Sequence, residues 1–460
     1  MEYRTEDDLL GPVRVPADAY WGAHTQRALE NFPLTGYRVA PGMIRAFAQV
    51  KKACCMANAE LGLLDAAKAA AISKACDEVA EGRWQDQFPV DALQGGAGTS
   101  TNMNVNEVIA NRAIELLGGA RGQYSMIHPI EQVNLNQSTN DTYPTALRVS
   151  AIAGLRALSQ AIAGLQGAFQ DREKQFAGIV TLGRTELQEA VPLTLGAEFS
   201  GFSEAMSRDR WRTFKCEERL RVVNLGGTAV GTGLSAPRSY IFLVAERLRD
   251  VTGLGLARGE NLVDQTANAD TFVEISGILK AHAASLAKIC NDLRLLSMLG
   301  EIRLPGLQAG SSIMPGKVNP VLLEAGIQAG MKVMANDSLI SEACSRGSLQ
   351  INEFLPLVSH SLHESLDLLT RVDTKLADHV RGITADEERC RSYVQASPMI
   401  VTALLPQIGY ERATALVSEY FASGRQSIVE FLSEKLGRRV VEEALSPRKL
   451  VSLGYKDGAV

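Results

Sequence analysis

Three segments of this chain carry apolar side chains at alternating spacings of three and four residues. They cover residues 152–169, 275–293 and 362–376. This spacing places one narrow apolar stripe along a helix, and such stripes are typical of rods packed nearly parallel. Because each stripe indicates a helix of about 20–30 residues, these helices exceed the usual globular length. The pattern therefore predicts a long helical bundle.

Alternating strand patterns are short and scarce, and residues 178–182 are one candidate. An α/β sheet needs strands that alternate regularly with helices, so we expect a mainly all-α fold. His282 takes an apolar position in the second stripe, and we interpret it as a packed core residue. A shift toward short, charged segments after about Ala385 predicts a small C-terminal unit.

The composition excludes several classes of protein. Hydrophobic residues make up 46% of the chain and charged residues 22%, which is typical of a globular protein and excludes disorder for most of it. The net charge of −5 is too acidic for a protein that holds nucleic acid through its phosphates. No stretch reaches the roughly 18 apolar residues of a membrane helix. The acidic residues 1–8 lack the apolar region of a secretory signal.

Cysteines and histidines are scattered along the chain. The seven cysteines form no C-x-x-C pair, so we expect neither a disulfide framework nor a zinc ribbon but reduced thiols of a cytoplasmic protein. His360 and His363 share a helical face, yet two ligands do not close a metal site, and we interpret them as polar helix positions. No nucleotide-binding motif is present. We therefore expect no metal and no cofactor.

Polar, glycine-rich segments separate the predicted helices. Each alone could be a turn or a helix start. Together they supply hydroxyls, amides and backbone N–H groups, with Lys317 in the last of them. That collection suits a small, multiply negative ligand, because neutral donors can hold one carboxylate while Lys317 supplies charge for another. Gly310 and Gly316 would let the last segment fold over a substrate. The segments are residues 94–102, 137–141, 183–188, 226–233 and 309–320.

The last segment resembles a known signature. Gly-Ser-Ser-Ile-Met-Pro-Gly-Lys-Val-Asn-Pro at 310–320 is similar to the signature loop of the aspartase/fumarase superfamily. Residues 96–104, 137–141 and 183–192 resemble the family's other active-site blocks, in the family's order. Similarity in residues 15–22 and 382–385 extends the resemblance over nearly all of the chain.

The resemblance implies a fold of three helical parts. These would be an N-terminal domain (1–138), a central five-helix-bundle domain with a mobile 310–320 loop (139–388) and a small C-terminal domain (389–460). It also implies a homotetramer whose bundles merge into a twenty-helix core, with each active site shared by three subunits.

The resemblance further implies a reaction, the cleavage of a C–N or C–O bond beside a carboxylate to release fumarate or a relative. Removal of a proton from the carbon next to that carboxylate gives an aci-carboxylate with two negative oxygens, which preorganised donors must stabilise. By similarity Ser311 is the general base. Because serine is normally too weak a base, loop closure and neighbouring donors must stabilise its alkoxide. By the same similarity the substrate-binding residues are Thr99, Ser138, Thr139 and Ser312 around that carboxylate, Lys317, Asn319 and Thr185 at the other one, and Asn140 near the leaving group.

Sequence segments outside these active-site blocks resemble the aspartase branch of the family. They are residues 8–11, 19–22, 224–234 and 289–296. We therefore expect an ammonia-lyase that converts L-aspartate to fumarate. Glu186 departs from the family, whose members carry histidine or glutamine after the threonine. A carboxylate there could attract an ammonium or a larger amine, or could replace glutamine as a hydrogen-bond acceptor.

Three alternatives stay open. One is a lyase for an N-substituted aspartate or another amine, since residues 297–304 are shorter and residues 342–350 longer than the family pattern. Another is fumarate hydratase, although residues 128–134 lack the Asn-Asp-His sequence of fumarases. The last is a catalytically silent scaffold, which intact Ser311, Lys317 and Asn319 argue against, because a binding module needs no base.

Overall fold

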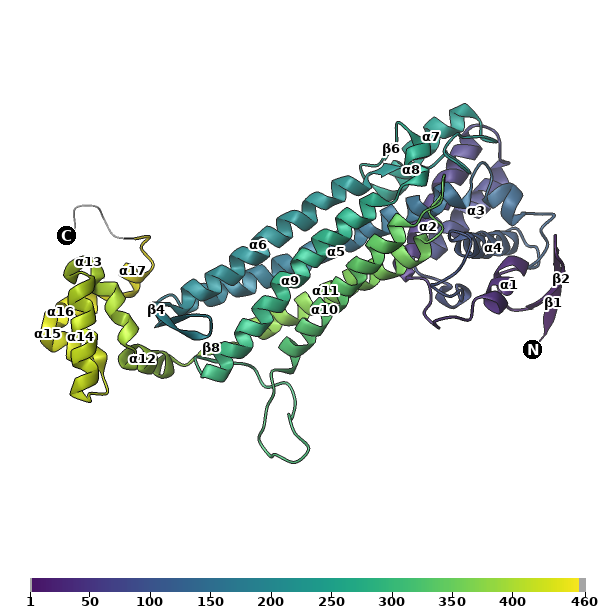
Figure 1. The fold of residues 1–460 in the computed structure, drawn as a ribbon. Helices are drawn as coiled ribbons and strands as arrows, with labels where there is room; N and C mark the ends of the chain where they lie inside the picture. The colour runs from purple at the N-terminus through teal and green to yellow at the C-terminus, as the bar shows by residue number, and fades with distance from the viewer. Residues whose placement is uncertain (1, 455–460) are drawn as a thin grey trace. The chain divides into compact units, whose positions relative to one another are not determined.

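The computed structural model describes residues 2–454, whose helices and strands are drawn in Figure 1, and these residues form two compact units. Unit 1 comprises Met1–Ser159, Arg212–Ala281 and Lys332–Leu368; unit 2 comprises Gln160–Trp211, His282–Met331 and Leu369–Val460. Long helices contribute to both units, and their bounds confirm the mainly all-α prediction. They are α5 (Thr139–Gln175), α6 (Leu195–Leu220), α9 (Asp270–Leu299), α10 (Val321–Ser345) and α11 (Leu355–Arg381).

The predicted apolar stripes lie on α5, α9 and α11 and face the core. All six stripe residues of α5 are at most 1% exposed. Within unit 1 the stripe of α5 approaches α11 so closely that a Cβ on Gly154 would lie 2.8 Å from a Leu366 methyl carbon. Within unit 2, Phe169 of α5 packs against Phe199 and Phe202 of α6. The long helices therefore pack side by side in each unit, as the stripes predict.

His282 is buried in the core, but it is more than a packed residue. Its Nδ1 lies 3.1 Å from Asp209 Oδ2 and its Nε2 lies 2.9 Å from Asp373 Oδ2. All three side chains belong to unit 2 and are at most 1% exposed. The interpretation of His282 as simple packing was therefore incomplete, because the side chain links α6, α9 and α11 through charge.

Unit 1 also contains shorter elements near the N-terminus and after α6. The acidic N-terminal segment forms an antiparallel hairpin that the sequence did not predict. Buried Glu107 accepts hydrogen bonds from the N–H groups of Gly22, His24 and Thr25, and so caps the start of α1. The elements are β1 (Tyr3–Asp8), β2 (Gly11–Pro16), α1 (Ala23–Asn31), α2 (Pro41–Glu60), α3 (Ala66–Ala80), η1 (Gln85–Gln87), α4 (Thr99–Leu116), η2 (Pro129–Val133), β5 (Val222–Val223), α7 (Arg238–Thr252), β6 (Ala257–Arg258) and α8 (Leu262–Ala267).

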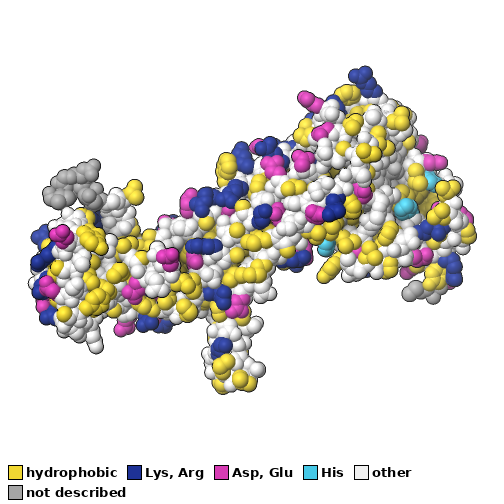
Figure 2. Space-filling view, viewed as in Figure 1, with side chains coloured by type: hydrophobic (Ala, Val, Ile, Leu, Met, Phe, Trp, Pro, Cys, Tyr) yellow, Lys and Arg dark blue, Asp and Glu magenta, His cyan; other side chains and the backbone are white. Residues whose placement is uncertain are grey.

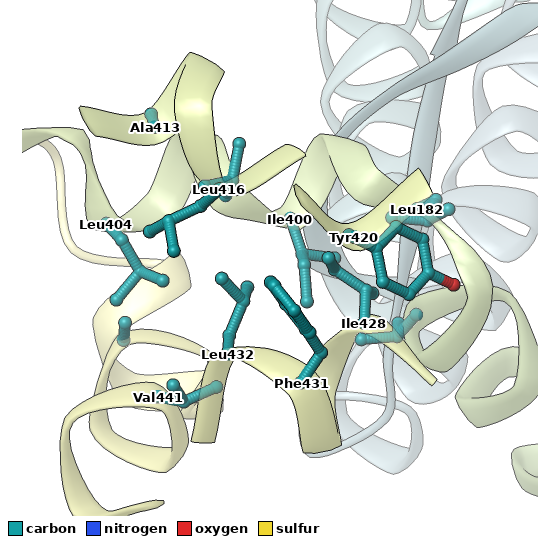
Figure 3. Close-up of a cluster of buried hydrophobic side chains, with 13 residues drawn as sticks. Leu182, Ile400, Leu404, Ala413, Leu416, Tyr420, Ile428, Phe431, Leu432 and Val441 are labelled. Atoms are coloured by element: carbon teal, nitrogen blue, oxygen red, sulfur yellow. The ribbon is translucent and has the colours of Figure 1, made fainter. Parts of the chain in front are cut away.

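Unit 2 contains a second hairpin and the C-terminal helices. The strand predicted at 178–182 begins at Val180 and continues to Thr185. Leu182 of this strand packs in one cluster with the apolar faces of the C-terminal helices, including Tyr420 and Phe431 (Figure 3). The elements are β3 (Val180–Thr185), β4 (Gln188–Thr194), β7 (Ile302–Arg303), β8 (Thr384–Ala385), α12 (Glu387–Ala396), η3 (Pro398–Leu404), α13 (Leu405–Ile408), α14 (Tyr410–Ser423), α15 (Ile428–Leu436), α16 (Arg438–Ala444) and α17 (Pro447–Leu450).

Charged side chains of both signs lie on the surface, and most of the cysteines lie inside. Acidic and basic side chains are interspersed on the face seen in Figure 2. The seven cysteines are free, and only Cys344 is partly exposed. Across residues 2–454, no helix has both the length and the apolar character needed to cross a membrane.

Candidate active site

In unit 1, Thr99 is the first residue of α4. Gly96, Ala97 and Gly98 precede it with positive φ angles of 79°, 55° and 90°. A Cβ on Gly98 would lie 2.1 Å from a ring carbon of Tyr143 in α5, so only glycine lets the α4 N-terminus approach α5 this closely. The Oγ1 of Thr99 donates to the Gly96 carbonyl at 2.7 Å.

Ser138 caps the start of α5. Its Oγ accepts from the Asn140 N–H at 3.2 Å, and its own N–H donates to Asp141 Oδ1 at 3.0 Å, a reciprocal capping arrangement. Thr139 Oγ1 accepts from Asn102 Nδ2 of α4 at 3.2 Å. The N-termini of α4 and α5 therefore meet in unit 1, and their partial positive charges favour an anion.

The 226–233 segment is held against the start of α5. Asn140 Nδ2 donates to the Ala229 carbonyl at 2.7 Å, and Asp141 Oδ2 accepts from the N–H groups of Gly226 and Thr228 at 3.1 and 3.0 Å. Burial raises the pKa of Asp141 to about 6, although these hydrogen bonds oppose the rise. Asp141 and Asn102 are not among the site residues predicted from the sequence, although the Ser138-x-x-Asp141 spacing is close to a capping box.

In unit 2, Thr185 and Glu186 lie at the end of the β3–β4 hairpin. Thr185 pairs with Gln188 across a two-residue turn, in which Glu186 and Leu187 have φ angles of 53° and 62°. Two residues with positive φ define a type I′ turn, which normally favours Asn-Gly. The turn therefore holds Glu186 exposed in a strained conformation.

Buried Glu301 anchors the first strand of this hairpin. Its Oε1 and Oε2 accept from the Arg184 guanidinium at 2.9 and 3.0 Å. The residue before Thr185 is therefore fixed by a two-point ion pair.

The 310–320 loop of unit 2 carries Ser311, Ser312, Lys317 and Asn319. The Gly310 N–H donates to the Lys317 carbonyl at 2.7 Å, and Asn319 Nδ2 donates to the Gly310 carbonyl at 2.8 Å. A Cβ on Gly310 would lie 2.8 Å from the Asn319 nitrogen. The ends of the loop are therefore tied together through a position that only glycine fills comfortably.

Ser311 Oγ accepts two backbone hydrogen bonds inside this loop. The donors are the N–H groups of Met314 at 2.9 Å and Ile313 at 3.2 Å. N–H donors stabilise negative charge on an oxygen, and so favour its deprotonated form. Ser312 and Lys317 are exposed beside it, and Lys317 forms no ion pair with any described residue.

The predicted site residues are therefore divided between the two units. Thr99, Ser138, Thr139 and Asn140 gather in unit 1. In unit 2 a cavity of about 1380 Å³ is lined by Glu186 and by side chains of α6 and α9, and no residue from 309 to 320 lines it. This cavity therefore joins the hairpin to α6 and α9 and not to the 310–320 loop.

The histidines take structural positions. His363 is buried, with its ring nitrogens 2.7 Å from the Ser359 carbonyl and 2.9 Å from Ser150 Oγ, and His360 stacks on the Tyr37 ring. Across residues 2–454, no cluster of three or more His, Cys, Asp or Glu side chains has the arrangement of a metal site.

Known proteins are similar to this chain in sequence and in fold. An aspartate ammonia-lyase from Bacillus sp is 43% identical, with 98% of each chain covered. The structure of a fumarate lyase:delta crystallin from Brucella melitensis bound to cobalt is 44% identical, with a TM-score of 0.93, and covers 98% of this chain and 100% of that one. A class II fumarase from Schistosoma mansoni is 32% identical, with a TM-score of 0.91, and covers 98% and 99%.

A family model described as lyase matches residues 11–335. This match covers most of the chain and includes every predicted site residue. The chain therefore belongs to this lyase family.

Proposed function

We propose that this protein is an aspartate ammonia-lyase, which eliminates ammonia from L-aspartate and releases fumarate. The observation that carries the proposal is the 43% identity, over 98% of both chains, to a relative of that name. The identity to the class II fumarase is lower, at 32%, which favours the amine branch over hydration of fumarate.

The geometry of Ser311 supports its role as the general base. A serine hydroxyl is ordinarily too weak an acid to supply an alkoxide, but the Oγ of Ser311 already accepts two backbone N–H groups. When the loop closes over the substrate, this oxygen would take the proton from the carbon beside the substrate carboxylate.

The helix N-termini of unit 1 support the binding of the aci-carboxylate. Thr99, Ser138 and Thr139 lie at the first turns of α4 and α5, where backbone N–H groups and hydroxyls can share two negative oxygens. Ser312 would add a hydroxyl from the loop. Lys317, Asn319 and Thr185 would hold the second carboxylate, and Asn140 would lie near the departing ammonia.

We propose that the enzyme is a homotetramer with a twenty-helix core and active sites shared by three subunits. Large apolar side chains are exposed on three long helices: Trp211 and Phe214 on α6, Met298 on α9 and Met331 on α10. In the proposed tetramer, helices of partner subunits would cover these side chains. The start of α5 at Thr139 supports the proposed division at 138, whereas the proposed division at 388 falls within the first turn of α12 (Glu387–Ala396). The buried free thiols support a reducing, cytoplasmic location.

A second candidate is a lyase for an N-substituted aspartate or a larger amine. It is favoured by Glu186, whose exposed carboxylate lines the cavity of unit 2 and could attract a cationic substituent.

The test is a spectrophotometric screen with L-aspartate, and in reverse with fumarate offered to ammonia, water and a panel of amines. We expect fumarate and free ammonia from L-aspartate. Turnover of fumarate only with larger amines would select the second candidate, and turnover with water alone would identify a hydratase.

Replacing the proposed base gives a sharper test of mechanism. We expect Ser311→Ala to keep the folded, assembled protein but to lose activity by roughly 100- to 10,000-fold. Full activity in this variant would show that Ser311 is not the base.

A further inference from the structure

Lys51 of α2 is a buried cation outside the proposed set of substrate-binding residues. It is 0% exposed and is one of the largest fully buried side chains of the protein. Burying an ammonium is unfavourable, and an apolar side chain of similar size would usually fill such a position at lower cost. The charge therefore calls for a functional explanation.

Neutral amides hold this ammonium. Its Nζ donates to Asn134 Oδ1 at 2.9 Å and to Gln137 Oε1 at 2.8 Å. Among the described residues no carboxylate lies within ion-pair distance of this nitrogen. Its positive charge is therefore not cancelled by direct contact, unlike that of its neighbour Lys52, which pairs with Asp77 at 2.6 Å.

Both amides belong to the turn that leads into α5. Gln137 directly precedes Ser138, and Asn134 Nδ2 donates to the Gln137 carbonyl at 3.2 Å. Asn134 Oδ1 also accepts from Asn102 Nδ2 at 3.2 Å, and the same Asn102 nitrogen lies 3.2 Å from Thr139 Oγ1. Gln137 therefore connects Lys51 to Ser138 along the chain. Asn134 and Asn102 connect Lys51 to Thr139 through side-chain hydrogen bonds.

The groups around Lys51 leave it charged near neutral pH. Burial lowers the pKa of Lys51 to about 8, and the charges of Cys54, Asp141 and Cys76 oppose this. Cys54 also faces Tyr240 of α7. Burial raises the pKa of the Cys54 thiol to about 12, and it raises the pKa values of Cys76 and Tyr240 well above their usual ranges. Only Asp141, whose pKa is about 6, and Lys51 itself therefore change charge between mildly acidic and alkaline pH.

We propose that Lys51 is a positioning residue for the dicarboxylate substrate: its buried ammonium fixes the 134–137 turn that presents Ser138, Thr139 and Asn140, and adds positive charge behind the two helix N-termini. This inference rests on the proposed function, because it needs a dicarboxylate at that place. The ammonium acts through the turn and through its field and does not touch the substrate.

The test compares Lys51→Met with Lys52→Met, which removes a charge from the adjacent position of the same helix. The probe is succinate, a saturated dicarboxylate that is fully ionised above about pH 7, measured both as an inhibitor and by calorimetry. We expect Lys51→Met to weaken succinate binding and raise the KM for L-aspartate by about tenfold or more. Lys52→Met should stay within about twofold of the unmodified protein. Equal, small effects in both variants would overturn the proposal.

The pH dependence of succinate affinity distinguishes this role of Lys51 from a merely structural one. In the unmodified protein, succinate affinity should fall as pH rises through about 8, because the ammonium loses its proton. In Lys51→Met the affinity should be low and independent of pH over that range. If Lys51→Met does not fold, the series on the unmodified protein decides, and an unchanged affinity across it overturns the proposal.

The two proposals fail in different ways. If L-aspartate is not a substrate, the proposed function fails, but the succinate measurements still test Lys51. If aspartate turnover is normal and succinate binding is insensitive to Lys51, only the inference about Lys51 fails.

Discussion

Between two buried carboxylates of unit 2, the His282 ring makes one hydrogen bond to Asp209 and one to Asp373. Burial alone would lower the pKa of this imidazole, but the charges and hydrogen bonds of Asp373 and Asp209 outweigh it and raise the pKa to about 10. His282 is therefore an imidazolium at neutral pH. The two carboxylates lie 73 and 91 positions away along the chain, so the local pattern around His282 could predict its burial but not its charge.

We expect His282→Asn to destabilise the protein by about 3–5 kcal/mol, because it removes the positive charge that lies between two buried carboxylates. Denaturant unfolding near neutral pH measures this. His360→Asn is the matched control, since His360 only stacks on Tyr37 at a partly exposed position of α11. A loss in His282→Asn no larger than in this control would contradict the ion-pair account.

The same residue predicts a dependence of stability on pH. The folded-state pKa of His282 is raised, so its contribution is fully present below the unfolded value near 6.5 and is lost as pH rises through about 10. The stability gap between the unmodified protein and His282→Asn should therefore narrow over that range. A gap that widens with pH would show that the imidazole is buried in its neutral form.

At the scale of elements, the long helices could be predicted because their apolar period repeats over many turns, as the buried stripe of α5 shows. The hairpins could be predicted less accurately than the long helices. The strand at 180–185 was placed approximately, but its turn consists of Glu186 and Leu187, whose positive φ angles contradict the usual residue preferences of such turns. The 310–320 loop was identified through a family resemblance, and its internal hydrogen bonds were not visible in the sequence.

The strained turn gives a stability prediction. Leu187 is 76% exposed, so its replacement by glycine removes little packing and relieves a positive φ angle. We expect Leu187→Gly to stabilise unit 2 by about 1 kcal/mol, measured by thermal unfolding. Leu9→Gly in the β1–β2 turn is the control, because Leu9 is fully exposed without a positive φ angle. Equal changes in both variants would show that the Leu187 backbone is not strained.

The loop gives a prediction for activity. Gly310→Ala would push a Cβ against the Asn319 nitrogen at 2.8 Å and the Lys317 carbonyl at 2.9 Å, and would displace Ser311. We expect a loss of kcat of roughly 100-fold with little change in melting temperature. Gly306→Ala is the matched control, since its Cβ would meet only a Val318 methyl at 3.6 Å. Comparable kcat values in the two variants would show that the loop geometry is not needed for turnover.

At the scale of the whole molecule, the proposed active site draws its residues from both units of the chain. Thr99 and Ser138 lie in unit 1, whereas Thr185 and Ser311 lie in unit 2. The periodic stripes could predict a bundle, but nothing in a single sequence states which helix face meets another subunit. The exposed Trp211, Phe214, Met298 and Met331 became candidates for that contact only in the structure.

Mixed tetramers test the sharing of sites between subunits. Thr99→Val and Ser311→Ala should each be nearly inactive alone. When the two variants are unfolded, mixed equally and reassembled, some sites will combine an intact Thr99 from one subunit with an intact Ser311 from another. We expect recovery of about a quarter of the unmodified activity. No recovery, despite mixed tetramers in native mass spectrometry, would mean that each site is built within one subunit.

The most direct test of the central claim is the product balance with L-aspartate as the only substrate. The purified protein should release fumarate, followed by its ultraviolet absorbance, and ammonia, assayed enzymatically, in equal amounts, and Ser311→Ala should release neither at a comparable rate. Absence of fumarate and ammonia from L-aspartate, with a folded protein and with turnover of another amine or of a hydroxy acid, would contradict the account.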